Sequence, residues 1–155
     1  MLAYTLDVAD HPRIQELRRR VQQDPASLSF APLAEELRRA GQLADAVATC
    51  RAGLKRHPEY VTARATLGRA LLDQGDLDAA LGELTTVLQA APEHLAALKG
   101  VAEIHVERGE IVAALASYRR AFDLAREDHD LARAIAALEA QAPPSASDPA
   151  SQAAP

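Results

Sequence analysis

The chain has 155 residues but no Trp and no Asn, only two Phe and three Tyr, and a single Cys. One cysteine cannot form an internal disulfide, so nothing in the sequence indicates an oxidising compartment. No apolar run approaches the ~20 residues of a membrane span, and residues 1–20 lack a signal-peptide pattern. We therefore expect a cytoplasmic protein without membrane insertion.

Positive charge is also scarce, with 17 Lys and Arg against 22 Asp and Glu, a net charge of −5. Binding to nucleic acid needs a basic surface, so we expect no nucleic-acid partner. The charge is uneven, because residues 1–69 carry +3 and residues 70–155 carry −8. Either an oriented contact surface or an ordinary solvated surface accounts for this difference. The 15 Arg against 2 Lys are typical of a GC-rich bacterial genome.

Small aliphatic residues dominate what is present. Ala and Leu, both strong helix formers, number 35 and 21. With so few aromatic residues the core must be aliphatic, and the composition predicts an all-α chain.

Glycines mark an internal repeat: Gly41, Gly75 and Gly109 are each separated by 34 residues. The same period relates several further series, namely Ala46, Ala80 and Ala114; Ala34, Gly68 and Ala102; Leu33, Leu67 and Val101; Pro58 and Pro92. Residues at one period across a chain indicate a repeated structural unit.

Each unit reads as two helices. In the central unit we expect a first helix over residues 62–74, ended by Gly75, because glycine readily adopts the positive φ of a helix C-terminus. Asp76 suits the N-cap of a second helix over residues 77–90, and Pro92 follows its end. Small residues at facing positions let the two helices approach closely.

This pattern resembles the tetratricopeptide repeat (TPR) family. Its hallmark positions are occupied in the central unit by Arg64, Leu67, Gly68, Leu71, Ala80, Leu84, Val87 and Pro92. The departures across the three units are Arg64, His105 and Arg126, which stand where the family has other residue types. The resemblance implies an all-α fold, a right-handed α-solenoid of helix-turn-helix repeats with capping helices at its N- and C-terminal ends.

The resemblance divides the chain into segments. Residues 27–126 form three TPR units, at 27–60, 61–94 and 95–126. Residues 1–26 hold an N-terminal capping helix, residues 127–142 a C-terminal one, and residues 143–155 a Pro/Ala/Ser-rich tail that we expect to be disordered. Pro32 predicts that the first helix of its unit starts late, near Ser29, or is kinked. Mid-helix Gly82 and Gly100 allow either close packing or flexing.

No pattern of residues indicates catalysis. Phosphate loops, nucleophile elbows and paired-cysteine motifs are absent from the sequence, and no His lies one turn from another His or from Cys. His105, Cys50 and Tyr118 stand at packing positions, and the acidic residues at 127, 128 and 130 suit a helix cap. We therefore expect no enzymatic activity, no metal and no cofactor.

The TPR resemblance places ligand contacts on the concave face formed by the first helices. Carried over by position, the candidate contact residues are Leu28, Glu35, Arg38, Arg69, Leu72, Lys99, Glu103 and Val106. A carboxylate clamp of the kind that holds chaperone C-termini is disfavoured, because Ala31 and Glu35 occupy its positions and the chain has no Asn. The mixture of basic, acidic and aliphatic residues favours a peptide of mixed charge.

These features predict a non-enzymatic protein–protein interaction module, such as an adaptor, scaffold or chaperone-like protein. Its concave face would hold a peptide or helix of a partner protein. The alternative is a self-associating scaffold, a homo-oligomer in which one array accepts another copy.

Overall fold

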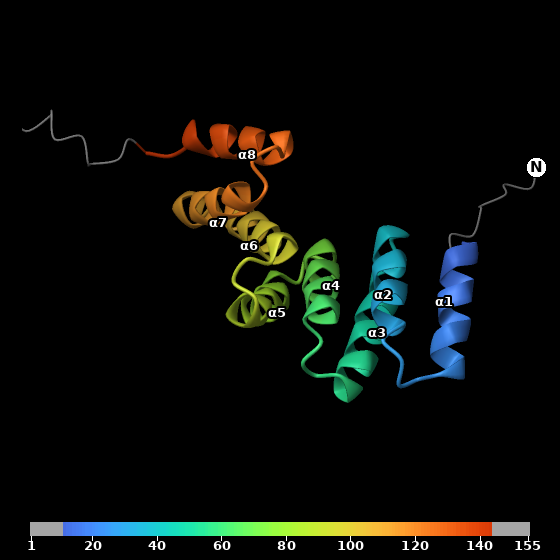
Figure 1. Ribbon diagram of the computed structural model, residues 1–155. Coiled ribbons are helices and arrows are strands. Elements are labelled where there is room, and N and C mark those ends of the chain that lie inside the picture. The colour runs from blue at the N-terminus through green and yellow to red at the C-terminus, as the bar shows by residue number, and fades with distance from the viewer. Residues whose placement is uncertain (1–10, 144–155) are drawn as a thin grey trace, which may run out of the picture.

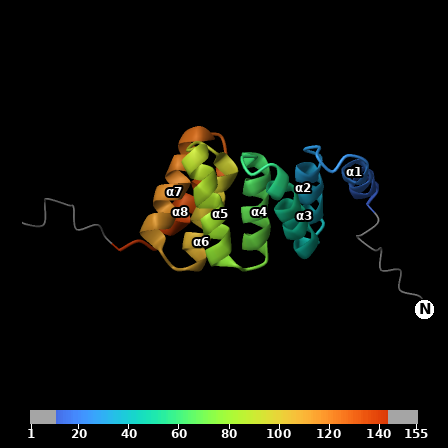
Figure 2. The ribbon, with the colours of Figure 1, turned by 90° about the horizontal axis from the view of Figure 1, so that it is seen from below.

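The computed structural model describes residues 11–143 of the chain. Within this range it contains eight helices and no strand. They are α1 (Pro12–Gln23), α2 (Phe30–Arg39), α3 (Leu43–Arg56), α4 (Val61–Asp73), α5 (Leu77–Ala90), α6 (Leu95–Glu107), α7 (Ile111–Leu124) and α8 (His129–Glu139). The helices stack along one array, with α1 and α8 at opposite ends (Figure 1, Figure 2). The chain is an all-α solenoid.

The helices pack in consecutive pairs, α2 with α3, α4 with α5 and α6 with α7. The first helices of these pairs also pack on one another, α2 on α4 and α4 on α6, whereas the backbones of α3, α5 and α7 stay farther apart within the described residues. The array is therefore curved, and the first helices lie on the inside of the curve. We call the face formed by α2, α4 and α6 the inner face.

The turn within each pair depends on its glycine. Gly41, Gly75 and Gly109 have φ of 77°, 83° and 72°, a conformation that other residues rarely adopt. In the central pair, the Asp76 side chain accepts a hydrogen bond from the backbone N–H of Ala79 and so caps α5. The predicted helix at 77–90 is confirmed, and the predicted helix at 62–74 is displaced by one residue.

Small residues allow the helices to pack closely. Ala46, Ala80 and Ala114 have no exposed surface. A Cβ atom added to Gly68 would lie 2.6 Å from Leu84, and one added to Gly100 would lie 2.7 Å from the same side chain. Leu84 thus fills the space between α4 and α6 that the two glycines leave open. Close packing explains Gly100 but not Gly82, whose added Cβ would meet nothing within 4 Å.

Pro32 lies in the first turn of α2 and does not kink it. The helix begins at Phe30, directly after Ser29, and the N–H of Leu33 already donates to the Ser29 carbonyl at 3.2 Å. A first-turn residue needs no intrahelical donor, so proline is tolerated there. The expected late start is confirmed.

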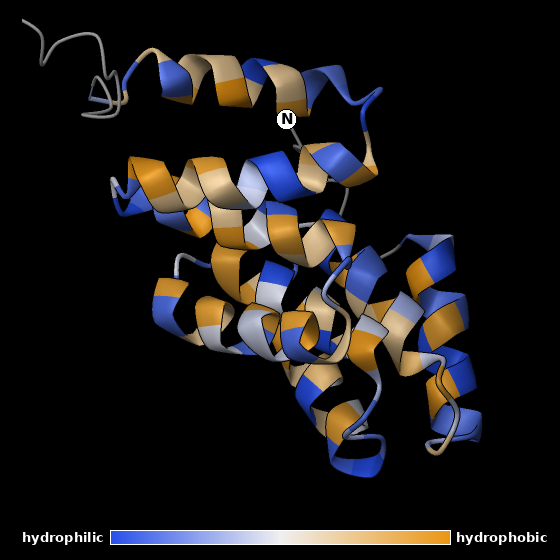
Figure 3. Cartoon of the chain, turned by 60° about the vertical axis from the view of Figure 1, so that its left-hand side comes forward, coloured by the Kyte–Doolittle hydropathy of each residue, from blue (hydrophilic) through white to orange (hydrophobic). Residues whose placement is uncertain are grey.

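A helix covers each end of the described array. Ile14 and Leu17 of α1 are buried against the array, as are Leu131 and Leu138 of α8. Asp128 caps α8 by accepting from the N–H groups of Asp130 and Leu131. Helices throughout carry both hydrophobic and hydrophilic residues (Figure 3). The division into units at 27–60, 61–94 and 95–126 stays our proposal, and the predicted tail lies outside the described residues from 144 onward.

Candidate functional site

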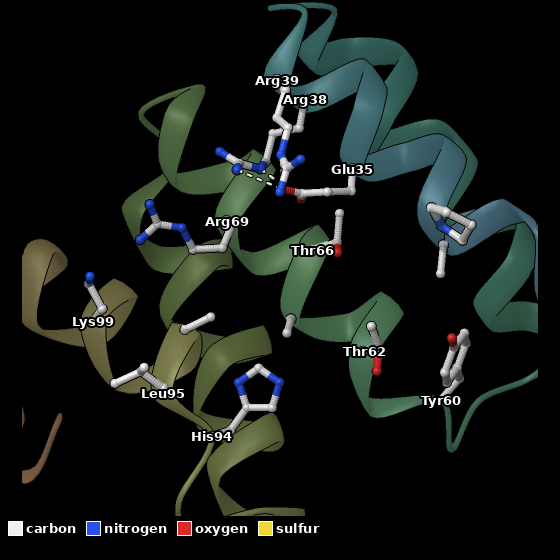
Figure 4. A pocket seen from close by; sticks show the side chains of 14 residues that line it. Glu35, Arg38, Arg39, Tyr60, Thr62, Thr66, Arg69, His94, Leu95 and Lys99 are labelled. Carbon is white, nitrogen blue, oxygen red and sulfur yellow. Dashed lines mark hydrogen bonds and ion pairs between the residues drawn. The ribbon is translucent and has the colours of Figure 1, made fainter. Parts of the chain in front are cut away.

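A groove of about 730 Å³ crosses the inner face, with a lining drawn from α2, α4, α6 and the residues just before α4 and α6. Four of the candidate contacts line it, namely Glu35, Arg38, Arg69 and Lys99. Arg38 and Arg39 lie at its upper edge in Figure 4, and Tyr60 and His94 at its lower part. The first helices therefore bring charged and uncharged side chains to one cavity.

Arg38 connects two helices rather than facing solvent freely. It donates to Glu35 through Nε at 3.0 Å and through Nη2 at 2.9 Å, and to Asp73 of α4 through Nη1 at 2.7 Å. Burial acts to raise the pKa of Glu35, but the hydrogen bonds from Arg38 and Arg39 bring it below its ordinary value. The hydrogen bond to Glu35 raises the pKa of Arg38 above its ordinary value. Arg38 is thus a structural cation, held between α2 and α4.

Arg69 and Lys99 also form ion pairs, Arg69 with an acid of α6 and Lys99 with Asp128, the residue that caps α8. Arg69 Nη1 donates to Glu103 Oε1 at 2.9 Å, and Lys99 Nζ donates to Asp128 Oδ2 at 3.2 Å. The candidate cations Arg38, Arg69 and Lys99 are therefore each held in an ion pair with a residue outside their own helix. Because all these side chains are partly exposed, each pair contributes little to stability.

Several donors in the groove remain available to a ligand. Within residues 11–143, Nε and Nη2 of Arg69 have no acceptor, and Arg39 uses only Nε, toward Glu35. Thr62 and Thr66 lie one turn apart on α4, and their hydroxyls have no hydrogen-bond partner in this range. These groups can donate to carboxylates and to peptide carbonyls.

His94 has a fixed role at the lower part of the groove. Its Nδ1 accepts a hydrogen bond from the N–H of Ala97 at 3.3 Å and so caps α6. This bond assigns the proton of the neutral ring to Nε2, which is then a donor. Leu95 follows it and adds an apolar side chain to the lining.

The other candidate contacts lie elsewhere. Leu72, Glu103 and Val106 line a separate hollow of about 250 Å³, together with Asp73, Glu107 and Tyr118. Leu28 is 48% exposed and lines neither cavity. The structure therefore divides the eight candidate residues between a groove, a neighbouring hollow and an isolated surface position.

Ten lining residues of the groove are not among the eight candidate contacts, namely Ala31, Pro32, Arg39, Tyr60, Thr62, Ala65, Thr66, His94, Leu95 and Ala96. Tyr60 and His94 immediately precede α4 and α6 at the same position of the 34-residue period. That shared position was a usable signal, since a residue at the start of a first helix points toward the same face in each unit.

The residues assigned to packing behave accordingly. Cys50 is fully buried, and burial raises the pKa of its thiol to about 12. His105 is half-buried and hydrogen-bonded to Glu110. In the part of the chain that the structure describes, no three His, Cys, Asp or Glu residues cluster as metal ligands. None of the described helices has the length and apolar character needed to cross a bilayer.

Consecutive helix pairs, with a groove across their inner face, define an α-solenoid of helical repeats. The tetratricopeptide repeat model matches residues 32–84 and again residues 65–129, which together exceed half of the chain. The chain belongs to the tetratricopeptide repeat family. This fold is that of a protein–protein interaction module.

Solved structures share the fold at low sequence identity. A crystal structure of MamA aligns with a TM-score of 0.73 at 16% identity, covering 83% of this chain and 75% of that one. MamA from Desulfovibrio magneticus RS-1 gives 0.73 at 19%, covering 83% and 73%. The thermophilic TPR protein TTC0263 from Thermus thermophilus gives 0.72 at 22%, covering 87% and 75%. No curated protein matches the chain.

Proposed function

We propose that this chain is a non-enzymatic interaction module that holds a segment of a partner protein on its inner face. The observation that carries the proposal is the groove of about 730 Å³ across three successive first helices. A cavity that crosses several units suits an elongated ligand better than a compact one. The cytoplasmic location and bacterial origin expected from composition stay predictions.

The lining of the groove indicates the chemistry of the segment. The unused donors of Arg39, Arg69 and Lys99 favour acidic side chains. Thr62 and Thr66 can donate to the carbonyl groups of a peptide backbone. Tyr60 and Leu95 offer an apolar surface to an aliphatic side chain.

The spacing of the cations favours an extended segment. Arg39, Arg69 and Lys99 lie on successive first helices, each about one helical turn earlier in the 34-residue period than the last. Helices packed about 10 Å apart and a turn of about 5.4 Å give roughly 11 Å between neighbouring cations. An extended chain rises about 3.3 Å per residue, so acidic residues three to four positions apart would match them.

Arg69→Gln tests this function against a partner obtained by affinity capture. The substitution removes a groove cation and should weaken binding about tenfold at low salt, or ~1.4 kcal/mol. Arg51→Gln is the matched control, because Arg51 is exposed on α3, outside the inner face. Equal binding by wild type and both variants would contradict the proposal.

Light scattering at two protein concentrations tests whether the partner is a second copy of the chain. A mass that grows with concentration in wild type, and not in Arg69→Gln, would make the groove a site of self-association. A mass unchanged in both proteins would leave a different protein as the partner.

A further inference from the structure

The small hollow beside the groove has a different chemical character. Its apolar lining comes from Leu72, Val106 and Tyr118, and Val106 is 39% exposed. Every charged residue in its lining is acidic: Asp73, Glu103 and Glu107. The groove, by contrast, is lined by four cations and one acid. The inner face therefore carries two neighbouring cavities of opposite charge.

Two ion pairs form the boundary between these cavities. In the Arg38–Asp73 pair and in the Arg69–Glu103 pair, the cation lines the groove and the acid lines the hollow. Each acid uses one oxygen in its pair, so its other oxygen has no described partner. Glu107 makes no ion pair within residues 11–143. The hollow therefore keeps a net negative charge beside an apolar floor.

We propose that the hollow is a second subsite, which takes a basic residue and an adjacent aliphatic residue of the same partner segment. This inference rests on the proposed function of the groove. The inner face then recognises a segment with a defined order of charge. Its acidic part lies over Arg39, Arg69 and Lys99, and its aliphatic and basic part lies over Leu72, Val106 and Glu107.

Charge complementarity favours this ligand over one of a single sign. A uniformly acidic segment that crossed the boundary would meet Asp73, Glu103 and Glu107, and like charges at an interface are repulsive. A uniformly basic segment would meet the same penalty over the groove. Only a segment with both charges, in the right order, satisfies both cavities.

Panning a phage-displayed library of random 12-residue peptides against the full chain tests the inference. Wild-type protein should enrich peptides with acidic residues at one end and an aliphatic residue next to Lys or Arg at the other. Glu107→Lys should lose the basic residue from the enriched set and keep the acidic ones. A synthetic peptide from the wild-type set should bind Glu107→Lys about tenfold more weakly.

The variant should fold normally, because Glu107 is exposed at the last residue of α6, where a Lys suits the helix dipole. Asp123→Lys is the matched control, with the same charge change near the end of α7, outside both cavities. It should enrich the same peptides as wild type.

Three results would count against us in different ways. Enrichment of purely acidic peptides, unchanged by Glu107→Lys, would overturn the second subsite and leave the groove intact. An equal loss of binding in Asp123→Lys would show that the net charge of the chain causes the loss in Glu107→Lys, and it would overturn the subsite. Absence of any peptide whose binding depends on Arg69 would overturn the proposed function as well.

Discussion

Gly100 is the point at which the packing between helices meets the inner face. A Cβ atom added there would lie 2.7 Å from the Leu84 side chain and 3.4 Å from the Arg69 side chain. Leu84 is fully buried and holds α4 to α6, whereas Arg69 lines the groove and pairs with Glu103. Neighbouring side chains thus serve separate purposes, so changes to the packing should unfold the array and changes to the face should alter binding.

The largest loss of stability should come from Leu84→Ala. Leu84 contacts the helices on both sides of α5, and removing a fully buried leucine side chain costs about 2–5 kcal/mol. Urea denaturation followed by circular dichroism measures the change. A loss below about 1 kcal/mol would show that α4 and α6 do not depend on this contact.

A pair of glycines sharpens the comparison within the packing. Gly100→Ala places a methyl group against Leu84 and should destabilise by roughly 1–3 kcal/mol. Gly82→Ala should instead stabilise by up to about 1 kcal/mol, because its added Cβ meets nothing and alanine favours the helix. Thermal melts of the two variants should therefore move in opposite directions. Movement in the same direction would contradict the packing described for Gly100.

Acid should weaken the ion pairs that Glu35 forms with Arg38 and Arg39 within α2. The pKa of this carboxyl is lower in the folded chain than its ordinary value of 4.5, so its contribution is present above that pH and disappears as the pH falls below it. Wild type should exceed Glu35→Gln in unfolding free energy at neutral pH, and the difference should narrow in acid. Glu36→Gln, one residue along α2, controls for the loss of one carboxylate from the helix. A constant difference for Glu35→Gln would contradict this role.

The smallest effect on stability is expected for Arg69→Gln. Its ion pair with Glu103 is partly exposed and contributes less than about 1 kcal/mol. The melting temperature should therefore stay close to that of wild type while partner binding weakens. A large drop in melting temperature would show that Arg69 stabilises the packing, and it would contradict the separation of packing residues from inner-face residues.

The 34-residue period explains which parts of the structure could be predicted. The turn glycines, the bounds of α3, α5 and α7 and the buried alanines each recur every 34 residues, because each helix pair repeats the same packing. The ion pairs do not recur in this way. Arg38, Arg69 and Lys99 stand at three different positions of the repeat, and each pairs with an acid outside its own helix, Asp73, Glu103 or Asp128. Their pairing depends on how units are placed relative to one another, which a period within one chain does not specify.

Arg64 shows the same limit. It replaces a family apolar residue, and its partners are Glu83 of α5 at 2.8 Å and the Pro58 carbonyl at 2.9 Å. The sequence shows that Arg64 departs from the family pattern. It does not show that Glu83 of the neighbouring helix α5 pairs with the guanidinium group. Arg39 and His94 were missed for a simpler reason, because they stand outside the repeat positions from which contacts were carried over.

The most direct test of the inner face is a chemical-shift titration of the ¹⁵N-labelled chain with the tightest-binding peptide from the library. We expect the largest amide shifts along α4 and the start of α6, around Thr62, Thr66, Arg69 and Leu95, with little change in α3, α5 and α7. Shifts concentrated on α3, α5 and α7, or on the end helices α1 and α8, would contradict the assignment of binding to the inner face.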